Sequence, residues 1–225
     1  MLKLIIGNKA YSSWSLRGWL AVKQSGLPFT EEVVSLYDEA WPARRQQPDL
    51  APSAGKVPLL WDGDVAVWES LAIIDTLADK VGAERFWPAD PAARAFARSI
   101  ASEMHAGFVD LRSECPTNFR KIFPTKAIGA GAQANVDRIV QLWDRALTRF
   151  GGHTGNDGGD FLFGEFGAAD IMYAPVTTRF TTYSLAVPEF ARDYCRRVLA
   201  HPFMQEWVDG AHAETWVIEK FEADR

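Results

Sequence analysis

The segment Gly55–Leu71, with the sequence GKVPLLWDGDVAVWESL, decides the expected fold of this 225-residue chain. Residues 58–61 and 65–68 are rich in apolar and aromatic side chains and predict two short strands. Residues 62–64 (Asp-Gly-Asp) are typical of a tight turn, because glycine adopts positive φ without steric cost. A helix is predicted directly after the second strand, and its apolar positions recur at helical spacing: Leu71, Ile74, Leu77 and Val81. The segment therefore predicts a β-hairpin that leads into a helix.

Glu69 and Ser70 stand at the start of this helix and are candidate ligand-binding residues. We expect Ser70 to be the N-cap, where serine is among the preferred residues. The backbone N–H groups and positive dipole of a helix N-terminus bind a carboxylate, and an adjacent glutamate can hold an ammonium group. The pair suits an α-amino acid. An ordinary capped helix without a ligand is the alternative.

Pro58 opens the first strand of the hairpin, where its missing N–H costs no hydrogen bond in the sheet. Turns of this kind sometimes contain a cis peptide bond. A cis Val57–Pro58 bond turns the N–H and C=O of Val57 outward, where an extended peptide can pair with them. Together with an amino-acid site at the next helix, this geometry predicts a site for a small α- or γ-linked peptide.

The Lys-Val-Pro-Leu-Leu and Trp-Glu-Ser sequences, with the following helix, resemble the glutathione-binding segment of bacterial cytosolic glutathione S-transferases. The resemblance implies a thioredoxin-like α/β N-terminal domain followed by an all-α domain. It also implies a cis Val57–Pro58 bond and pairing of the Val57 backbone with the cysteinyl part of glutathione. Glu69 and Ser70 are then expected to hold the γ-glutamyl end, and Lys56 belongs to the same glutathione-binding segment.

Ser12 and Ser13 follow the first expected strand, at the start of a helix with an apolar stripe at residues 16–20. Capping alone explains serines at this place. A bound thiol gives them a second role, because a helix N-terminus lowers the pKa of a thiol. A serine hydroxyl that donates to the sulfur stabilises the thiolate further. We therefore predict Ser12 as the thiol-activating residue, with Ser13 as the alternative.

The sequence of residues 12–17, Ser-Ser-Trp-Ser-Leu-Arg, is similar to the Ser-Ser-Cys-x-Trp-Arg signature of zeta-class transferases, which include maleylacetoacetate isomerases. By position, Ser12 matches the first serine of that class, its favoured thiol activator, and Ser13 matches the second. Trp14 replaces the cysteine and Leu16 replaces the tryptophan. Without a cysteine at the helix start, the sequence does not favour the thiol–disulfide chemistry of omega- and glutaredoxin-like relatives.

Residues 37–55 are irregular, and in the family this region contributes to the glycyl end of glutathione. The candidates for that end are Trp41, Arg44, Arg45 and Lys56. Charges on a solvated surface are the simpler explanation for these basic residues.

Residues 82–90 contain glycine, proline and charge, and are the expected linker between a domain at 1–81 and an all-helical domain at 91–225. Apolar spacing predicts one long amphipathic helix from Pro91 to about Cys115. In transferases this helix lines the electrophile pocket. The candidate substrate contacts are Trp14, Met104, His105, Phe108 and Arg112. For His105, a partly exposed helix position without a chemical role is the alternative.

Gly167 and Asp170 resemble the capping box that starts the central buried helix of transferases, with glycine where the family has serine or threonine. Asp170 at the N3 position can accept a hydrogen bond from the N–H of the cap residue. We expect this motif to serve folding and not chemistry.

Composition limits the partners. The net charge is −5, and no Lys/Arg cluster exceeds a pair, so a nucleic-acid partner is not expected. No run approaches the roughly 18 apolar residues of a membrane span, and no signal peptide opens the chain. Cys115 and Cys195 lack CxxC or metal-ligand spacing. We predict a cytoplasmic, metal-free protein without disulfides and without a membrane partner.

These observations predict a glutathione transferase with a role in detoxification. Glutathione is the expected cosubstrate, and its thiolate is expected to attack a small hydrophobic electrophile. The resemblance implies a homodimer. One alternative is a maleylacetoacetate-isomerase-like enzyme that returns glutathione unchanged. The other is a non-catalytic binding module on the same fold, because a fold does not fix a function.

Overall fold

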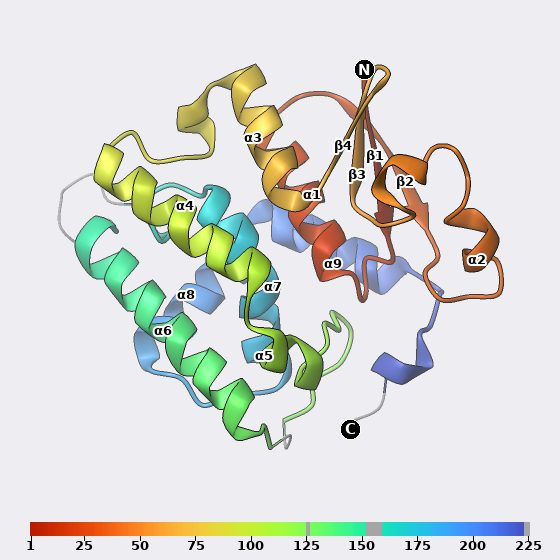
Figure 1. Ribbon diagram of the computed structural model, residues 1–225. Coiled ribbons are helices and arrows are strands. Elements are labelled where there is room, and N and C mark those ends of the chain that lie inside the picture. The colour runs from red at the N-terminus through yellow and green to blue at the C-terminus, as the bar shows by residue number, and fades with distance from the viewer. Residues whose placement is uncertain (125–126, 152–158, 223–225) are drawn as a thin grey trace.

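A four-stranded mixed sheet forms the N-terminal part of the computed structural model, which describes residues 1–124, 127–151 and 159–222 (Figure 1). The strand order is β2-β1-β3-β4. The strands are β1 (Leu2–Gly7), β2 (Phe29–Val34), β3 (Leu59–Asp62) and β4 (Val65–Trp68). β1 pairs parallel with β2 and antiparallel with β3, and β3 pairs antiparallel with β4. This topology confirms the predicted thioredoxin-like domain and its hairpin.

Helices cover both faces of the sheet. The helices α1 (Ser13–Ser25) and α3 (Ser70–Val81) lie on the face toward the rest of the chain (Figure 1). The short α2 (Trp41–Arg44) and a 3₁₀ turn (Ala51–Ser53) connect β2 to β3 on the opposite side. A small apolar core lies under this connection and consists of Ile5, Val34, Leu50 and Leu59.

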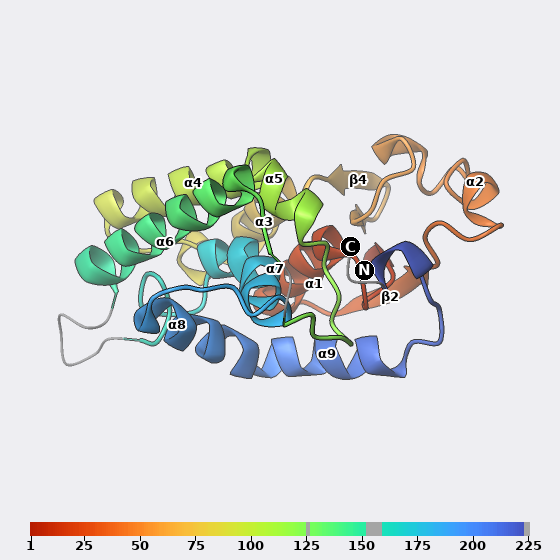
Figure 2. The same cartoon turned by 90° about the horizontal axis from the view of Figure 1, so that it is seen from below.

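The remainder of the chain is helical. A 3₁₀ turn (Ala83–Arg85) leads to α4 (Pro91–Ala106), α5 (Val109–Glu114), α6 (Ala130–Phe150), α7 (Ala168–Thr182), α8 (Glu189–Ala200), α9 (Pro202–Ala213) and a last 3₁₀ turn (Glu219–Phe221). Figure 2 shows α4 and α6 as an outer layer, α7 in the middle and α8 and α9 on the other side. An all-α part therefore follows the sheet, as predicted.

The helix α1 joins the two parts, because it packs against β1 and α3 on one side and against α7 and α9 on the other. Its start is fixed by Ser12, whose side chain accepts a hydrogen bond from the N–H of Ser15. The helix α7 is almost entirely buried. Its capping box forms as predicted, since the Gly167 N–H donates to Asp170 Oδ2 at 3.0 Å. The two central helices thus begin with the caps that the sequence predicts.

Two helix predictions are wrong in detail. The expected helix from Pro91 to Cys115 is divided, because α4 ends at Ala106 and Phe108 adopts a left-handed φ of 59° before α5. The apolar spacing continues across the break, which is why the sequence does not reveal it. Ser70 is not the N-cap of α3 but its first residue; the cap residue is Glu69, whose side chain makes no capping bond.

Within the described residues, no helix has the length and apolar composition needed to cross a membrane. The same residues contain no group of three or more His, Cys, Asp or Glu side chains placed to hold a metal ion.

Candidate functional site

A cavity of about 420 Å³, the first cavity, lies between the start of α1, the β2–β3 connection and the start of α3. Its wall contains predicted site residues from three separate segments: Ser12, Trp14, Lys56, Val57, Pro58, Glu69 and Ser70. Residues that were not predicted complete it: Leu36, Tyr37, Gly55 and Trp68, while Trp41 and Arg45 are glycyl-end candidates. The folded chain therefore brings most of the predicted peptide-binding residues together.

The backbone at Val57 is available for pairing. The Val57–Pro58 peptide bond is cis, as predicted. Neither the N–H nor the C=O of Val57 forms a hydrogen bond with the described residues. Gly18 on α1 makes this turn possible, because a Cβ there would lie 2.7 Å from Pro58 Cβ. A side chain at position 18 would push α1 away from the turn, so this glycine belongs to the site although no sequence motif marks it.

Glu69, Ser70 and His105 form a polar cluster at the start of α3. Glu69 adopts a φ of 66°, which is uncommon for a residue with a side chain. His105 Nε2 lies 3.2 Å from Glu69 Oε2, and His105 Nδ1 lies 3.5 Å from Ser70 Oγ. Burial lowers the pKa of His105, and the Glu69 carboxylate opposes that shift. A neutral ring with its proton on Nε2 donates to Glu69, so His105 holds the Glu69 side chain beside the first cavity.

Ser12 and Ser13 face different cavities although they are adjacent. Ser12 lines the first cavity, and its Oγ lies 2.8 Å from Ser15 Oγ. Ser15 in turn accepts the Gly7 N–H at 2.9 Å. Ser13 Oγ accepts a hydrogen bond from Arg179 Nη2 at 3.3 Å and lines a second cavity. The Ser12 hydroxyl donates to Ser15 Oγ, and rotation about its C–O bond would direct the same proton toward a group in the first cavity.

The second cavity has a volume of about 350 Å³ and lies between the start of α1, α5 and the C-terminal segment. Its lining residues are Tyr11, Ser13, Val109, Arg112, Ser113, Pro116, Thr117, Arg179 and Phe221. Of these, only Ser13 and Arg112 are predicted site residues. The Arg112 guanidinium stacks 4.5 Å from the ring of Trp14, which lines the first cavity. Trp14 and Arg112 therefore form a wall that the two cavities share.

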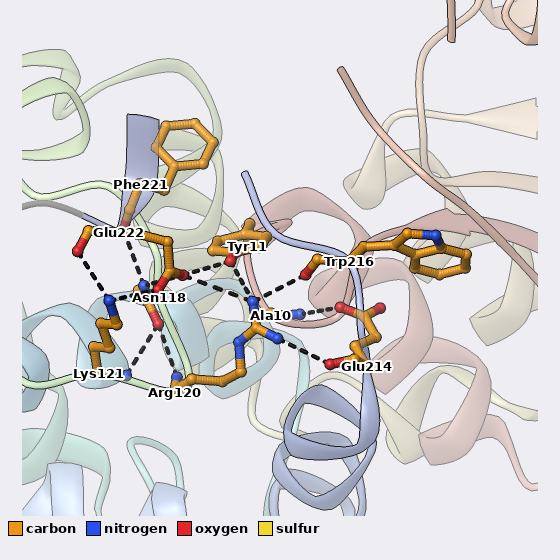
Figure 3. Close-up of polar contacts among 9 residues, drawn as sticks. All are labelled: Ala10, Tyr11, Asn118, Arg120, Lys121, Glu214, Trp216, Phe221 and Glu222. Carbon is orange, nitrogen blue, oxygen red and sulfur yellow. Dashed lines mark hydrogen bonds and ion pairs between the residues drawn. The ribbon is translucent and has the colours of Figure 1, made fainter. Parts of the chain in front are cut away.

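A hydrogen-bond network holds the outer wall of the second cavity (Figure 3). Glu222 pairs with Lys121 at 2.7 Å and accepts hydrogen bonds from Asn118 and from the Tyr11 hydroxyl. Arg120 reaches across to the backbone of the C-terminal segment, where it donates to the Glu214 carbonyl at 2.9 Å. These contacts fix Tyr11 and the neighbouring Phe221, whose ring centroids lie 5.8 Å apart. The last described residues of the chain thus shape the cavity.

Four predicted residues line neither cavity. His105 lies behind Glu69, and Met104 and Phe108 are buried in the apolar core. Arg44, a candidate for the glycyl end, instead pairs with Asp49 at 2.8 Å and with Glu32 at 2.6 Å.

The site also contains residues that the sequence analysis missed. Ser15 carries a signal, because a serine three positions after a capping serine lies on the same helical turn. No sequence pattern indicates Arg179 or Phe221, since each reaches the second cavity from a segment more than 100 positions away from Ser13.

Comparison with protein-family models matches residues 11–80 to "Glutathione S-transferase, N-terminal domain" and residues 127–210 to "Glutathione S-transferase, C-terminal domain". Together these matches span more than half of the chain. Among curated proteins, GstB of Escherichia coli K12 is 32% identical over 130 residues, which cover 54% of this chain and 57% of GstB. The alignment thus spans little more than half the length of that glutathione S-transferase.

Solved structures with the same fold cover nearly the whole chain. A glutathione transferase homologue from Burkholderia, solved with bound glutathione, has a TM-score of 0.68 at 22% identity and covers 95% of this chain and 99% of its own. The theta-class enzyme of Xanthomonas axonopodis pv. citri, with glutathione bound, has a TM-score of 0.63 at 21% identity, with coverage of 92% and 96%. These similarities establish the two-part fold.

Proposed function

Because the chain belongs to the glutathione S-transferase family, we propose that it is an enzyme that transfers glutathione to an electrophile. The observation that carries the proposal is the first cavity. It gathers Ser12, the Val57–Pro58 turn and the Glu69–Ser70 pair from three separate segments. Each of these groups suits a different part of one tripeptide thiol.

Glutathione is proposed to bind along the first cavity in an extended form. Glu69 and Ser70 take the ammonium and carboxylate groups of the γ-glutamyl end. The free N–H and C=O of Val57 pair with the cysteinyl backbone, and Pro58 holds the turn. Arg45 and Lys56 supply positive charge for the glycyl carboxylate, with Trp41 beside them. Arg44 is left out of this proposal because two carboxylates already bind its guanidinium.

Ser12 is proposed to stabilise the glutathione thiolate. In the structure the Ser12 hydroxyl donates to Ser15 Oγ and accepts from the Ser15 N–H. When glutathione binds, the Ser12 hydroxyl is proposed to turn and donate to the sulfur at the N-terminus of α1. Each pKa unit by which the thiol is lowered corresponds to about 1.4 kcal/mol. No general base is required once the thiolate is the stable form at neutral pH. Ser13 is the less favoured candidate for this role because its hydroxyl faces the second cavity.

The electrophile is proposed to occupy the second cavity, against Trp14 and Arg112. No direct contact with the electrophile is proposed for Met104, Phe108 and His105, since they line neither cavity. Their proposed role is to position the residues that contact it. The family resemblance further implies a cytoplasmic homodimer, to be tested by light scattering. The zeta-like motif at residues 12–17 keeps glutathione-dependent isomerisation as the second candidate, because both reactions use the same activated thiol.

Calorimetric titration and thiol assays test this proposal together. Glutathione titrated into the purified protein is expected to bind saturably and to be displaced by S-methylglutathione. With 1-chloro-2,4-dinitrobenzene, each product formed is expected to consume one thiol. Catalysis of an isomerisation without thiol loss would favour the second candidate, binding without either reaction would favour a binding module, and the absence of glutathione binding would reject all three.

A further inference from the structure

Three arginines converge at the wall between the two cavities. The guanidinium carbon of Arg17 lies 4.6 Å from the centroid of the Trp14 ring, and that of Arg112 lies 4.5 Å from the centroid of a Trp14 ring. Arg179 reaches the cluster from α7 and contacts Ser13. The side chains of Arg17 and Arg179 are buried, with exposed fractions of 0% and 3%. Positive charge is thus concentrated where little water is available to screen it.

The polar partners of these arginines are neutral. Arg17 donates through Nε to the Met172 carbonyl at 2.9 Å, while its Nη1 and Nη2 are buried without a hydrogen-bond partner. Arg179 donates to two backbone carbonyls and to the hydroxyl of Ser13. Throughout the described part of the chain, none of the three forms an ion pair. The guanidinium of Arg112 makes no hydrogen bond to the described residues.

This arrangement is electrostatically costly. Burial lowers the pKa of Arg112, and burial followed by repulsion from Arg112 lowers the pKa of Arg179 to about 10. Burial and the charges of Arg179 and Arg112 lower the pKa of Arg17 in the same way. Buried charges are ordinarily paired, and leaving them unpaired is strongly destabilising. An anion placed beside them would relieve this repulsion.

The second cavity provides the place for such an anion. Arg112 and Arg179 both line it, and no Asp or Glu side chain is among its described lining residues. Tyr11, Val109 and Phe221 offer apolar surface on the remaining wall. A guanidinium presents two N–H groups in the spacing of a carboxylate, which gives a strong and directional contact.

We propose that the second cavity selects a small electrophile that carries a carboxylate, held by Arg112 with Arg179 behind it, while the apolar wall covers the body of the molecule. The proposal replaces the neutral hydrophobic electrophile expected from the sequence with an anionic one. It rests on the proposed function for the transfer step, but the binding of the carboxylate does not depend on that step.

A pair of reporter substrates that differ only in charge tests the proposal. These are 4-chloro-3,5-dinitrobenzoate and its neutral analogue 4-chloro-3,5-dinitrobenzamide. In both, the glutathione sulfur forms a bond to the ring carbon, chloride leaves with the electron pair of the carbon–chlorine bond, and the thiol proton passes to solvent. We expect kcat/KM, divided by the rate with free glutathione, to be higher for the benzoate.

Substitutions at Arg112 test whether this residue causes the preference for the benzoate over the benzamide. Arg112→Met is expected to lower the ratio of kcat/KM for the benzoate to kcat/KM for the benzamide about tenfold, as loss of one charge-assisted bond predicts. Arg112→Lys keeps the charge and should retain part of the preference. Arg98→Met is the matched control, because it removes an exposed arginine of α4 that stacks on Trp87. Equal rates for the two substrates, or an equal loss for both in Arg112→Met, would overturn the proposal.

Direct binding separates this inference from the transfer reaction. The unreactive 4-amino-3,5-dinitrobenzoate is titrated by calorimetry into wild type and Arg112→Met, each with and without glutathione, and the corresponding benzamide serves as control. Arg112-dependent binding of the benzoate, together with no thiol consumption by either chlorodinitro substrate or by 1-chloro-2,4-dinitrobenzene, would uphold the inference and reject the proposed function. Glutathione transfer to electrophiles, without any preference for the carboxylate in binding, would uphold the proposed function and reject the inference.

Discussion

The first and second cavities are neighbours but are built in different ways. The first is formed by segments within the first 70 residues, and it depends on backbone features such as the Val57–Pro58 turn and the start of α3. The second is closed by residues as distant as Tyr11 and Phe221, and its character comes from side chains. Because of this division, side chains of the second cavity could be changed without altering the backbone features of the proposed glutathione site. The two serines at the start of α1 mark the boundary, since one faces each cavity.

The largest predicted effect is a loss of glutathione affinity on substitution of Glu69 or Ser70, with ligand binding to the second cavity unchanged. Removing a charge-assisted hydrogen bond typically costs about 1.5–3 kcal/mol. Glu69→Ala and Ser70→Ala should therefore each weaken glutathione binding by roughly tenfold to a hundredfold, measured by calorimetry. Binding of 4-amino-3,5-dinitrobenzoate to the second cavity should stay unchanged in both variants.

Asp79→Ala provides a matched control for this prediction, because it removes an exposed carboxylate from the same helix. Its glutathione affinity should equal that of the wild type. If both site variants also bind like the wild type, the start of α3 is not the γ-glutamyl site. If they lose both ligands together, the cavities are not independent.

A smaller effect distinguishes the adjacent serines. Ser12→Ala should raise the thiol pKa of bound glutathione by about one unit and lower turnover about tenfold at neutral pH, because the thiolate loses a donor. Ser13→Ala should leave that pKa unchanged, since its hydroxyl contacts Arg179 in the second cavity. The thiolate absorbance near 240 nm, followed against pH, reports the pKa directly.

Two other results would contradict the assignment of thiol activation to Ser12. A raised thiol pKa in Ser13→Ala alone would move the activating role by one position and place the thiol in the second cavity. An unchanged pKa in both variants would assign activation to the dipole and N–H groups of α1. The serines would then serve only as helix caps.

The different construction of the cavities explains what the sequence could predict. The hairpin and the cap of α1 follow from local rules for proline, glycine and serine, and the family resemblance implied the cis bond, so most of the first cavity was predicted. The break at Phe108 was missed because the apolar spacing continues through it. Arg179 was missed because only the packing of α7 against α1 brings it to Ser13, and no local pattern encodes that contact.

The smallest predicted effect concerns His105, which the sequence assigned to the electrophile pocket and the structure places beside Glu69. Burial lowers its pKa below the usual value of about 6.5, so the unfolded chain takes up a proton first as the pH falls. The stability that the neutral ring contributes is present above that value and is lost as the pH falls through the folded-state pKa. His105→Gln should therefore reduce the slope of unfolding free energy against pH below about 6.5, measured by urea denaturation.

His201→Gln shows whether His105 serves the first cavity or only the core. Burial also lowers the pKa of His201, which stacks on Phe166 with ring centroids 4.1 Å apart, so its loss should reduce the same stability slope. Only His105 lies beside the proposed ammonium site, where a protonated ring would repel the γ-glutamyl ammonium group. Glutathione affinity should therefore fall with decreasing pH in the wild type and in His201→Gln, and fall less in His105→Gln. Identical affinity profiles for the two variants would make His105 a packing residue of α4 and remove it from the glutathione site.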